Sequence, residues 1–299
     1  MAVQYPLVVF TLLLCFASGI FAIQGWLLYK GKGSKKFHQL ALIVEFAALC
    51  VGGFASFLHL HHWERIFNGF GHLTSGITQE LIGMVVIVLA IVIVFMMMRK
   101  AEGGEPSKMP QWVGIMALAV GIILGFVCAH SYAMPARPAW NNFTLYLFYY
   151  ASEFILGAAG IWLLSAITKE DDDVVKFLAK LTFIAAIVSA VIMVICVIFY
   201  STIGYDTVGI MWDVTDPTQP AADPSTSLAA PLSGAEAPLF WGGAVCVGAL
   251  VPAVLAYLKM KTPQGTLPFA VITCLCTLVG GICFRIVWYA VAIGFYVYY

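Results

Sequence analysis

Eight separate stretches of this 299-residue chain are long and apolar enough to cross a lipid bilayer. The hydrocarbon core of a bilayer is about 30 Å thick, and a helix needs roughly 20 predominantly apolar residues to span it. The composition agrees, since 62% of the residues are hydrophobic and only 10% are charged. The sequence therefore predicts an all-α membrane protein with spans near residues 6–29, 38–60, 77–98, 112–132, 143–167, 175–200, 239–258 and 267–292.

The basic residues predict which loops face the cytoplasm, because Lys and Arg accumulate on that side of membrane proteins. Twelve of the fifteen Lys and Arg follow the first, third, fifth and seventh predicted spans, whereas the opposite loops hold only Arg65 and Arg137. No Lys or Arg precedes the first span, so we expect a retained helix rather than a signal peptide. Both termini and the long polar loop at residues 201–238 are then predicted to lie outside.

Other compositional features narrow the function classes. All eight cysteines lie in apolar runs without a CxxC pair, so we expect them to be structural and expect no iron–sulfur cluster in this chain. No basic patch suggests nucleic acid as a partner. With no soluble segment of useful size left over, residues 1–299 are predicted to form a single transmembrane domain of the cell membrane, in a bacterium the cytoplasmic membrane.

Ionisable groups inside hydrocarbon are the natural functional candidates, because each costs about 2.5–3.5 kcal/mol to insert at the centre of a span. With the predicted orientation and a rise of about 1.5 Å per residue, four of them fall near the outer face. Two others lie deeper, one halfway across and one nearer the cytoplasm. The outer group is His59, Glu80, His130 and Arg285, and the deeper pair is Glu153 and Glu45.

This outer group suits a ligand with an apolar body and a polar head that exchanges protons, such as a quinol. An imidazole accepts protons near neutral pH, a partly buried carboxyl titrates close to that range, and an arginine stabilises developing negative charge. Structural roles are also open for each residue. Glu80 can pair with Arg65 or Arg285, His130 can be interfacial, and Glu45 and Glu153 can join helices by hydrogen bonds. A metal site in the loop at residues 61–72 is less favoured, because its histidine spacing is weak.

Several short motifs, in order along the chain, resemble the DmsC-type membrane anchor subunit of dimethyl sulfoxide reductase and related molybdenum oxidoreductases. The likeness extends over nearly all eight spans and is firmest in the first hundred residues and the last span. The stretches that carry it are PLVVFT (6–11) with ASGI (17–20), ASFLHL (55–60) with RIFN (65–68), SGITQE (75–80) and RIVWY (285–289).

The resemblance implies an anchor that binds menaquinol or another quinol near the outer face and oxidises it. The family's quinol-linked His and Glu fall on His59 and Glu80, and its RxFN arginine falls on Arg65. Arg285 and His130, the latter standing where the family has arginine, are expected to complete the quinol-binding set. Iron–sulfur clusters and molybdopterin are implied in two partner subunits, with no haem or cluster in this chain, and electrons are expected to pass to the iron–sulfur subunit.

Two other function classes stay open from the residues themselves. A haem b cytochrome anchor needs paired imidazoles, for which His59 and His130 are the available pair. A small-molecule or ion transporter would use Glu45, Glu153 and Arg285 as a relay, although no inverted repeat is evident. The quinone, the terminal substrate and the direction of electron flow are not set by this chain.

Overall fold

The computed structural model describes residues 3–59, 68, 70–135, 137, 139–203 and 227–292. Within this part of the chain, eight helices are long and apolar enough to cross a membrane, which confirms the prediction of a multi-pass helical protein. Short helical turns η2 (Glu102–Gly104), η3 (Pro106–Lys108) and α7 (Ala230–Ser233) lie in loops. The spans are α1 (Tyr5–Tyr29), α2 (Lys35–Phe57), α3 (Gly76–Lys100), α4 (Gln111–Ser131), α5 (Phe143–Thr168), α6 (Asp172–Ser201), η5 with α8 (Pro238–Leu250 and Val251–Lys259) and α9 (Thr266–Val291).

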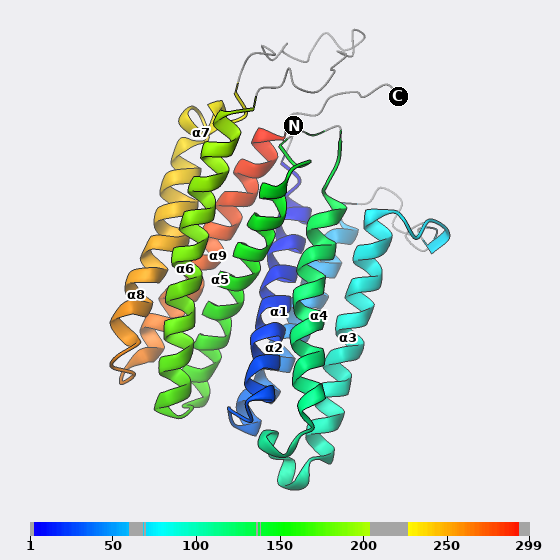
Figure 1. Cartoon of the computed structure of the whole chain (residues 1–299), viewed down its shortest axis with the longest axis vertical. Helices are drawn as coiled ribbons and strands as arrows, with labels where there is room; N and C mark the ends of the chain where they lie inside the picture. Colours follow the sequence, from blue (N-terminus) through cyan, green and yellow to red (C-terminus); the bar gives the residue numbers. More distant parts are fainter. Residues whose placement is uncertain are drawn as a thin grey trace.

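The helices run side by side in alternating directions, with α1 in the interior (Figure 1). Helix α1 packs extensively on α2, α4 and α5, while α3 packs on the far side of α4. Helix α5 in turn packs on α6 and α9, and η5 and α8 complete that side. The first two helices of the chain therefore lie on one side of the molecule together with α3 and α4, and α5 joins them to the remaining helices.

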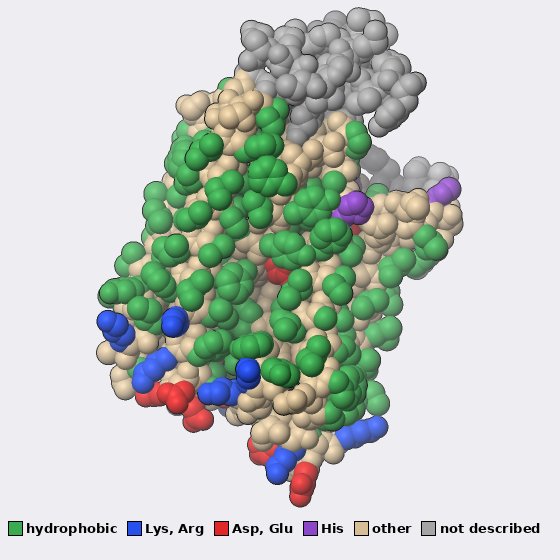
Figure 2. Space-filling model, viewed as in Figure 1, with side chains coloured by type: hydrophobic (Ala, Val, Ile, Leu, Met, Phe, Trp, Pro, Cys, Tyr) green, Lys and Arg blue, Asp and Glu red, His purple; other side chains and the backbone are tan. Residues whose placement is uncertain are grey.

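Charged side chains gather at one end of the helices. Figure 2 shows Lys, Arg, Asp and Glu at this end and a broad belt of hydrophobic side chains along the visible face. The loops at this end join α1 to α2, α3 to α4, α5 to α6 and α8 to α9, and we call it the charged end. Helix α1 begins, and α9 ends, at the opposite end (Figure 1). The assignment of the charged end to the cytoplasm stays a prediction.

A cap explains why α2 begins three residues earlier than the sequence predicted. The Ser34 side chain accepts the backbone N–H of Phe37 at 3.2 Å, which satisfies a free donor of the first turn. The backbone N–H and hydroxyl of Ser34 also donate to the Glu170 carboxylate, at 2.7 and 2.5 Å. The loop before α2 is therefore fastened to the loop before α6 at the charged end.

Two glycines allow α1 and α5 to approach closely in the interior. A Cβ atom on Gly157 would overlap the backbone of Gly19, and a Cβ on Gly19 would overlap the Glu153 carbonyl group. Lipid tails are as apolar as leucine, so helices in membranes associate through close packing of small residues. This contact holds together the two helices that join the halves of the structure.

The seventh span is a π-helix for its first 13 residues, where the sequence predicted one regular helix. The backbone N–H of Val251 bonds to the carbonyl of Cys246, five residues earlier, and Pro252 then follows with no N–H to donate. The wider winding is therefore confined to η5, and α8 returns to regular helical geometry.

We expect Gly157→Leu to disrupt the contact between α1 and α5, because the new side chain meets backbone that cannot move aside. Overpacking of this kind costs about 1–3 kcal/mol or more. Thermal unfolding in detergent, followed by gel filtration, should show a lowered midpoint. Gly242→Leu is the matched control, since a Cβ there meets nothing within 4 Å. Equal thermal midpoints for the two variants would contradict a role of Gly157 in packing α5 against α1.

Candidate functional site

A cavity of about 320 Å³ lies at the end of the helices opposite the charged end. Three helices and the end of a fourth line it, and the residues that face it on α2 and α3 follow helical spacing. Its size lies at the lower end of the range for small-molecule pockets, which is about 300–1,000 Å³. The lining residues are Leu7 and Phe10 from α1; Gly53, Ser56, Phe57 and His59 from α2 and its end; Ile77, Glu80, Leu81 and Met84 from α3; and Ser131, Tyr132 and Met134 from α4 and its end.

Glu80 provides the carboxylate of this cavity. It lies in the second turn of α3 and is 8% exposed. The Ser131 hydroxyl, at the end of α4, donates to its Oε1 at 2.7 Å. Helices α3 and α4 come close enough for this bond because Gly76 faces the Ser131 backbone, where a Cβ would overlap it. Glu80 is therefore fixed in position by a neutral donor.

His59 provides the imidazole. It follows the last turn of α2, where its backbone N–H bonds to the Ser56 carbonyl at 3.2 Å, and it is half-buried. The cavity thus has a protonatable side chain from α2 on one wall and one from α3 on another. The structure brings together the two residues that the sequence placed at the centre of the site.

Arg285 does not line this cavity; it lies behind the α1 wall. The side chain is 1% exposed and donates from Nε to Thr11 Oγ1 at 2.9 Å and from Nη2 to the Thr11 carbonyl at 3.2 Å. Further bonds reach Ser152 Oγ at 3.1 Å and the Gly281 carbonyl at 3.1 Å. Thr11 Oγ1 itself donates to the carbonyl of Leu7 at 2.9 Å. A chain of hydrogen bonds therefore links Arg285 to a cavity-lining residue.

His130 also lies away from the cavity. Its ring is exposed, stacks on Phe126 with centroids 5.9 Å apart, and lies 3.1 Å from the Tyr146 hydroxyl through Nδ1. Successive residues of a helix point in directions about 100° apart around the helix axis. Ser131 therefore faces Glu80, and the preceding residue, His130, does not. His130 lies in the last turn of α4, at the same end of the helices as His59 and Glu80, but its ring points away from both of them.

The other residues singled out in the sequence are placed as follows. Arg65 lies outside the described residues, as do His61 and His62. Glu153 and Glu45 are buried elsewhere and line no wall of the cavity. The described residues include no group of three or more His, Cys, Asp or Glu side chains that could hold a metal ion.

Ser131 and Tyr132 are site residues that the sequence analysis missed. Tyr132 is 7% exposed and belongs to a cluster of rings, with its centroid 5.7 Å from that of Trp140 and 5.4 Å from that of Trp288. The sequence feature that could have indicated them is their position directly after His130, at the end of a predicted span. Which of three adjacent residues faces inward depends on how α4 packs against α3.

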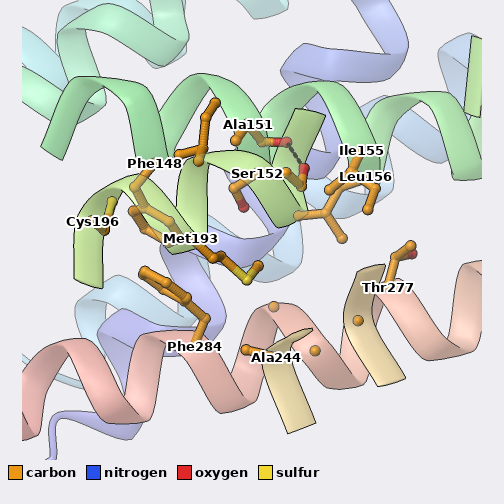
Figure 3. Close-up of a pocket in the computed structure, with 15 residues that line it drawn as sticks. Phe148, Ala151, Ser152, Ile155, Leu156, Met193, Cys196, Ala244, Thr277 and Phe284 are labelled. Atoms are coloured by element: carbon orange, nitrogen blue, oxygen red, sulfur yellow. Dashed lines mark hydrogen bonds between the residues drawn. The ribbon is translucent and has the colours of Figure 1, made fainter. Parts of the chain in front are cut away.

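A second, much smaller space lies between α5, α6, η5 and α9 (Figure 3). It measures about 20 Å³, which is room for a water molecule and not for an organic ring. Phe148 and Phe284 stack beside it with centroids 3.9 Å apart, and the Ser189 hydroxyl donates to the Ala151 carbonyl at 3.1 Å. Gly281, whose carbonyl accepts from Arg285, also borders this space.

Comparison with known proteins supports one family. A family model described as DMSO reductase anchor subunit (DmsC) matches residues 1–291, which is nearly the whole chain. The chain therefore belongs to this family, as its motifs indicated. The curated proteins and the solved structures compared with it gave no match.

We expect Arg285→Ala to destabilise the protein, because the change leaves hydrogen-bond acceptors on α1, α5 and α9 without their donor in a water-free interior. A hydrogen bond to a charged group contributes about 1.5–3 kcal/mol, so a loss on the order of 3 kcal/mol is expected. The measurement is the thermal midpoint in detergent. Arg99→Ala, at an exposed position near the charged end of α3, is the control. A midpoint for Arg285→Ala that matches this control would show that the four bonds contribute little.

Proposed function

From its membership of the DMSO reductase anchor family, we propose that this chain anchors a molybdopterin and iron–sulfur oxidoreductase complex in the membrane and oxidises a quinol in the cavity between α1, α2, α3 and α4. The partners are an iron–sulfur subunit and a molybdopterin catalytic subunit. The observation that carries the proposal is the pairing of His59 with Glu80 in one cavity of suitable size. Each arises from a different helix, and each can accept a proton.

The chemistry follows from what a quinol must lose. Oxidation of a quinol to a quinone releases two protons and two electrons. His59 and Glu80 are the proton acceptors, one for each hydroxyl, and the two electrons leave one at a time for the iron–sulfur subunit, whose clusters would accept them. The Ser131 hydroxyl helps by stabilising the ionised form of Glu80, the form that takes up a proton.

Arg285 acts on this site from a distance. Its positive charge lies behind the α1 wall. The groups that accept its four described hydrogen bonds are all neutral. Charges act over longer distances in a medium of low dielectric constant than in water, so Arg285 favours negative charge in the cavity. Its bonds through Thr11 also fix the wall formed by Leu7. Arg65 is proposed to complete the site from the loop after α2.

The two alternative functions, a haem b cytochrome anchor and a small-molecule or ion transporter, are not supported. The described geometry separates His59 from His130, because one ring faces the cavity and the other stacks on Phe126 at the surface. They do not form the facing pair that a haem iron would need. The match to an anchor family over residues 1–291 likewise favours an electron-transfer subunit over a transporter.

We expect His59→Ala and Glu80→Gln each to lower quinol oxidation by the assembled complex by about 10²-fold or more, the usual contribution of a positioned proton acceptor. The measurement is the optical change of quinol oxidation in membranes that contain the complex. His130→Ala is the matched control, because that ring lies outside the cavity. Turnover near wild type for the first two variants, in an assembled complex, would exclude these roles.

The sidedness of the site gives a separate test. From the distribution of basic loops we expect the cavity to lie at the outer face, so that protons are released outside and the step separates little charge. An epitope inserted in the loop at residues 102–108 should react with antibody only in inside-out vesicles, since this loop lies at the charged end. Reaction in right-side-out vesicles would reverse the orientation.

A further inference from the structure

The Ser131 hydroxyl has two acceptors within reach but only one hydrogen to donate. Its Oγ atom lies 2.7 Å from Glu80 Oε1 and 2.9 Å from the backbone carbonyl oxygen of Cys128, three residues earlier on α4. A serine hydroxyl carries one O–H donor and two lone pairs, and its hydrogen rotates to suit the groups around it. At any moment the hydroxyl therefore donates to the carboxylate or to the carbonyl, and it can accept a hydrogen bond as well.

The way in which α4 ends leaves the Cys128 carbonyl to Ser131. In a continuing helix the backbone N–H of Tyr132 would bond to this carbonyl, but it bonds to the Ala129 carbonyl instead, at 3.1 Å. Cys128 is 0% exposed, so water does not reach it. The Ser131 hydroxyl is the described donor that takes the place of the N–H, and it keeps this second acceptor whatever the state of Glu80.

The backbone around the hydroxyl is fixed from the side of α3. A Cβ atom on Gly76 would lie 2.6 Å from Ser131 Cα and 2.9 Å from Ser131 Cβ, so the two helices are in close contact there. Gly76 and Glu80 are four residues apart and lie on the same face of α3. The Cys128 thiol also lies beside the Glu80 carboxyl, but a thiol is a weak donor. Rotation of the Ser131 hydroxyl is therefore the smallest movement that changes the hydrogen bonds of this carboxyl.

A buried carboxyl without such a partner behaves differently. Glu45 on α2 is 0% exposed, and neither of its oxygens has a hydrogen-bond partner among the described residues. An isolated carboxylate is costly in hydrocarbon, so we expect Glu45 to stay a neutral acid. Glu80 is 8% exposed, and a hydroxyl serves its ionised form. Of these two carboxyls, Glu80 is the one that finds a partner in both protonation states.

We propose that Ser131 is a positioning residue that lets Glu80 take up a proton by rotation of one hydroxyl, with no movement of heavier atoms. While Glu80 is ionised, Ser131 donates to Oε1. When Oε1 gains a proton, the new O–H donates back to Ser131 Oγ, and the Ser131 hydrogen turns to the Cys128 carbonyl. This inference rests on the proposed function for the source of the proton: one O–H bond of the quinol breaks and one forms on Glu80. In both states each O–H of the pair has an acceptor.

The test follows the Cys128 carbonyl itself, in assembled complex whose cysteines carry an isotope label at the carbonyl carbon. Infrared difference spectra compare the ionised and protonated states of Glu80, set by pH. Glu80→Gln identifies the Glu80 signal, and Cys128→Ala identifies the labelled carbonyl. The Cys128 carbonyl band should move to lower wavenumber when Glu80 is protonated, because it gains a hydrogen bond, and should not move in Ser131→Ala. A Cys128 band that is the same in both states would overturn the inference, since the hydroxyl would then stay on one acceptor.

Turnover gives a second measurement. Ser131→Ala should lower the rate at saturating quinol by about tenfold and leave the quinol dissociation constant within about twofold, because the hydroxyl acts on proton uptake and not on the ring. Ser131→Thr keeps the hydroxyl and should recover most of the rate. A rate for Ser131→Ala equal to wild type, or no recovery in an assembled Ser131→Thr complex, would also overturn the role. Should Ser131→Thr fail to assemble, the infrared comparison of Ser131→Ala with wild type decides.

The matched control is Ser201→Ala. Ser201 is also the last residue of its helix, α6, and its hydroxyl bonds to the carbonyl three residues earlier, at 2.6 Å, away from the cavity. This variant should leave the rate, the dissociation constant and the Cys128 band unchanged.

Failure of the proposed function gives a different pattern from failure of the rotation. If Glu80→Gln turns over as wild type does, Glu80 is not the proton acceptor, even where the Cys128 band moves in the infrared spectra. If Glu80→Gln is slow and the Cys128 band does not move, the acceptor stands and the Ser131 hydroxyl does not turn.

Discussion

The absence of water from the bilayer interior is the constraint on which the rest of this structure depends. Polar groups there must find partners within the protein, because hydrocarbon offers none. Arg285 meets this requirement with four hydrogen bonds to neutral groups on three helices. Glu80 meets it with the Ser131 hydroxyl and still borders a cavity. The first residue holds three helices together, and the second is the one for which we propose a role in the chemistry.

Close packing of small residues complements these polar bonds. The contact of Gly19 with Gly157 brings α1 against α5, and the threonine next to the cavity wall then lies within reach of Arg285. Helices α2 and α3 pack on each other much less than on α1 and α4, and a Cβ on Gly53 of α2 would lie 3.6 Å from Met84 Cε of α3. The cavity is therefore bounded on one side by closely packed helices and on the other by α2 and α3, which pack less on each other.

Length and apolar composition predicted the helical class and the eight spans, because crossing a bilayer sets both directly. The short motifs around His59 and Glu80 predicted the family. Both residues line the cavity, and their role in the chemistry stays a proposal. The rotation of each helix was harder to predict. In soluble proteins the apolar face of a helix shows which side is buried, but lipid is as apolar as the interior, so these helices are apolar on all sides.

That limit applies to His130 and Arg285, neither of which lines the cavity. His130 and Ser131 are adjacent and lie at the same depth, yet only Ser131 bonds to Glu80, because the packing of α4 on α3 sets which of them turns inward. Arg285 has the expected depth but is drawn behind α1 by Thr11 and Ser152. Neither direction can be derived from spacing along one helix. The seventh span was also predicted as one regular helix, whereas its first part, Pro238–Leu250, is a π-helix.

Photolabelling tests the central claim most directly, namely that a quinol head group binds between α2 and α3 beside the end of α4. A quinone with a photoreactive group on its ring is bound to the assembled complex, irradiated, and located by mass spectrometry of the peptides. The account predicts labels on cavity residues such as Phe57, Leu81 and Met134, and their loss when unlabelled quinol competes. Competed labels confined to α6, η5 or α9 would contradict it.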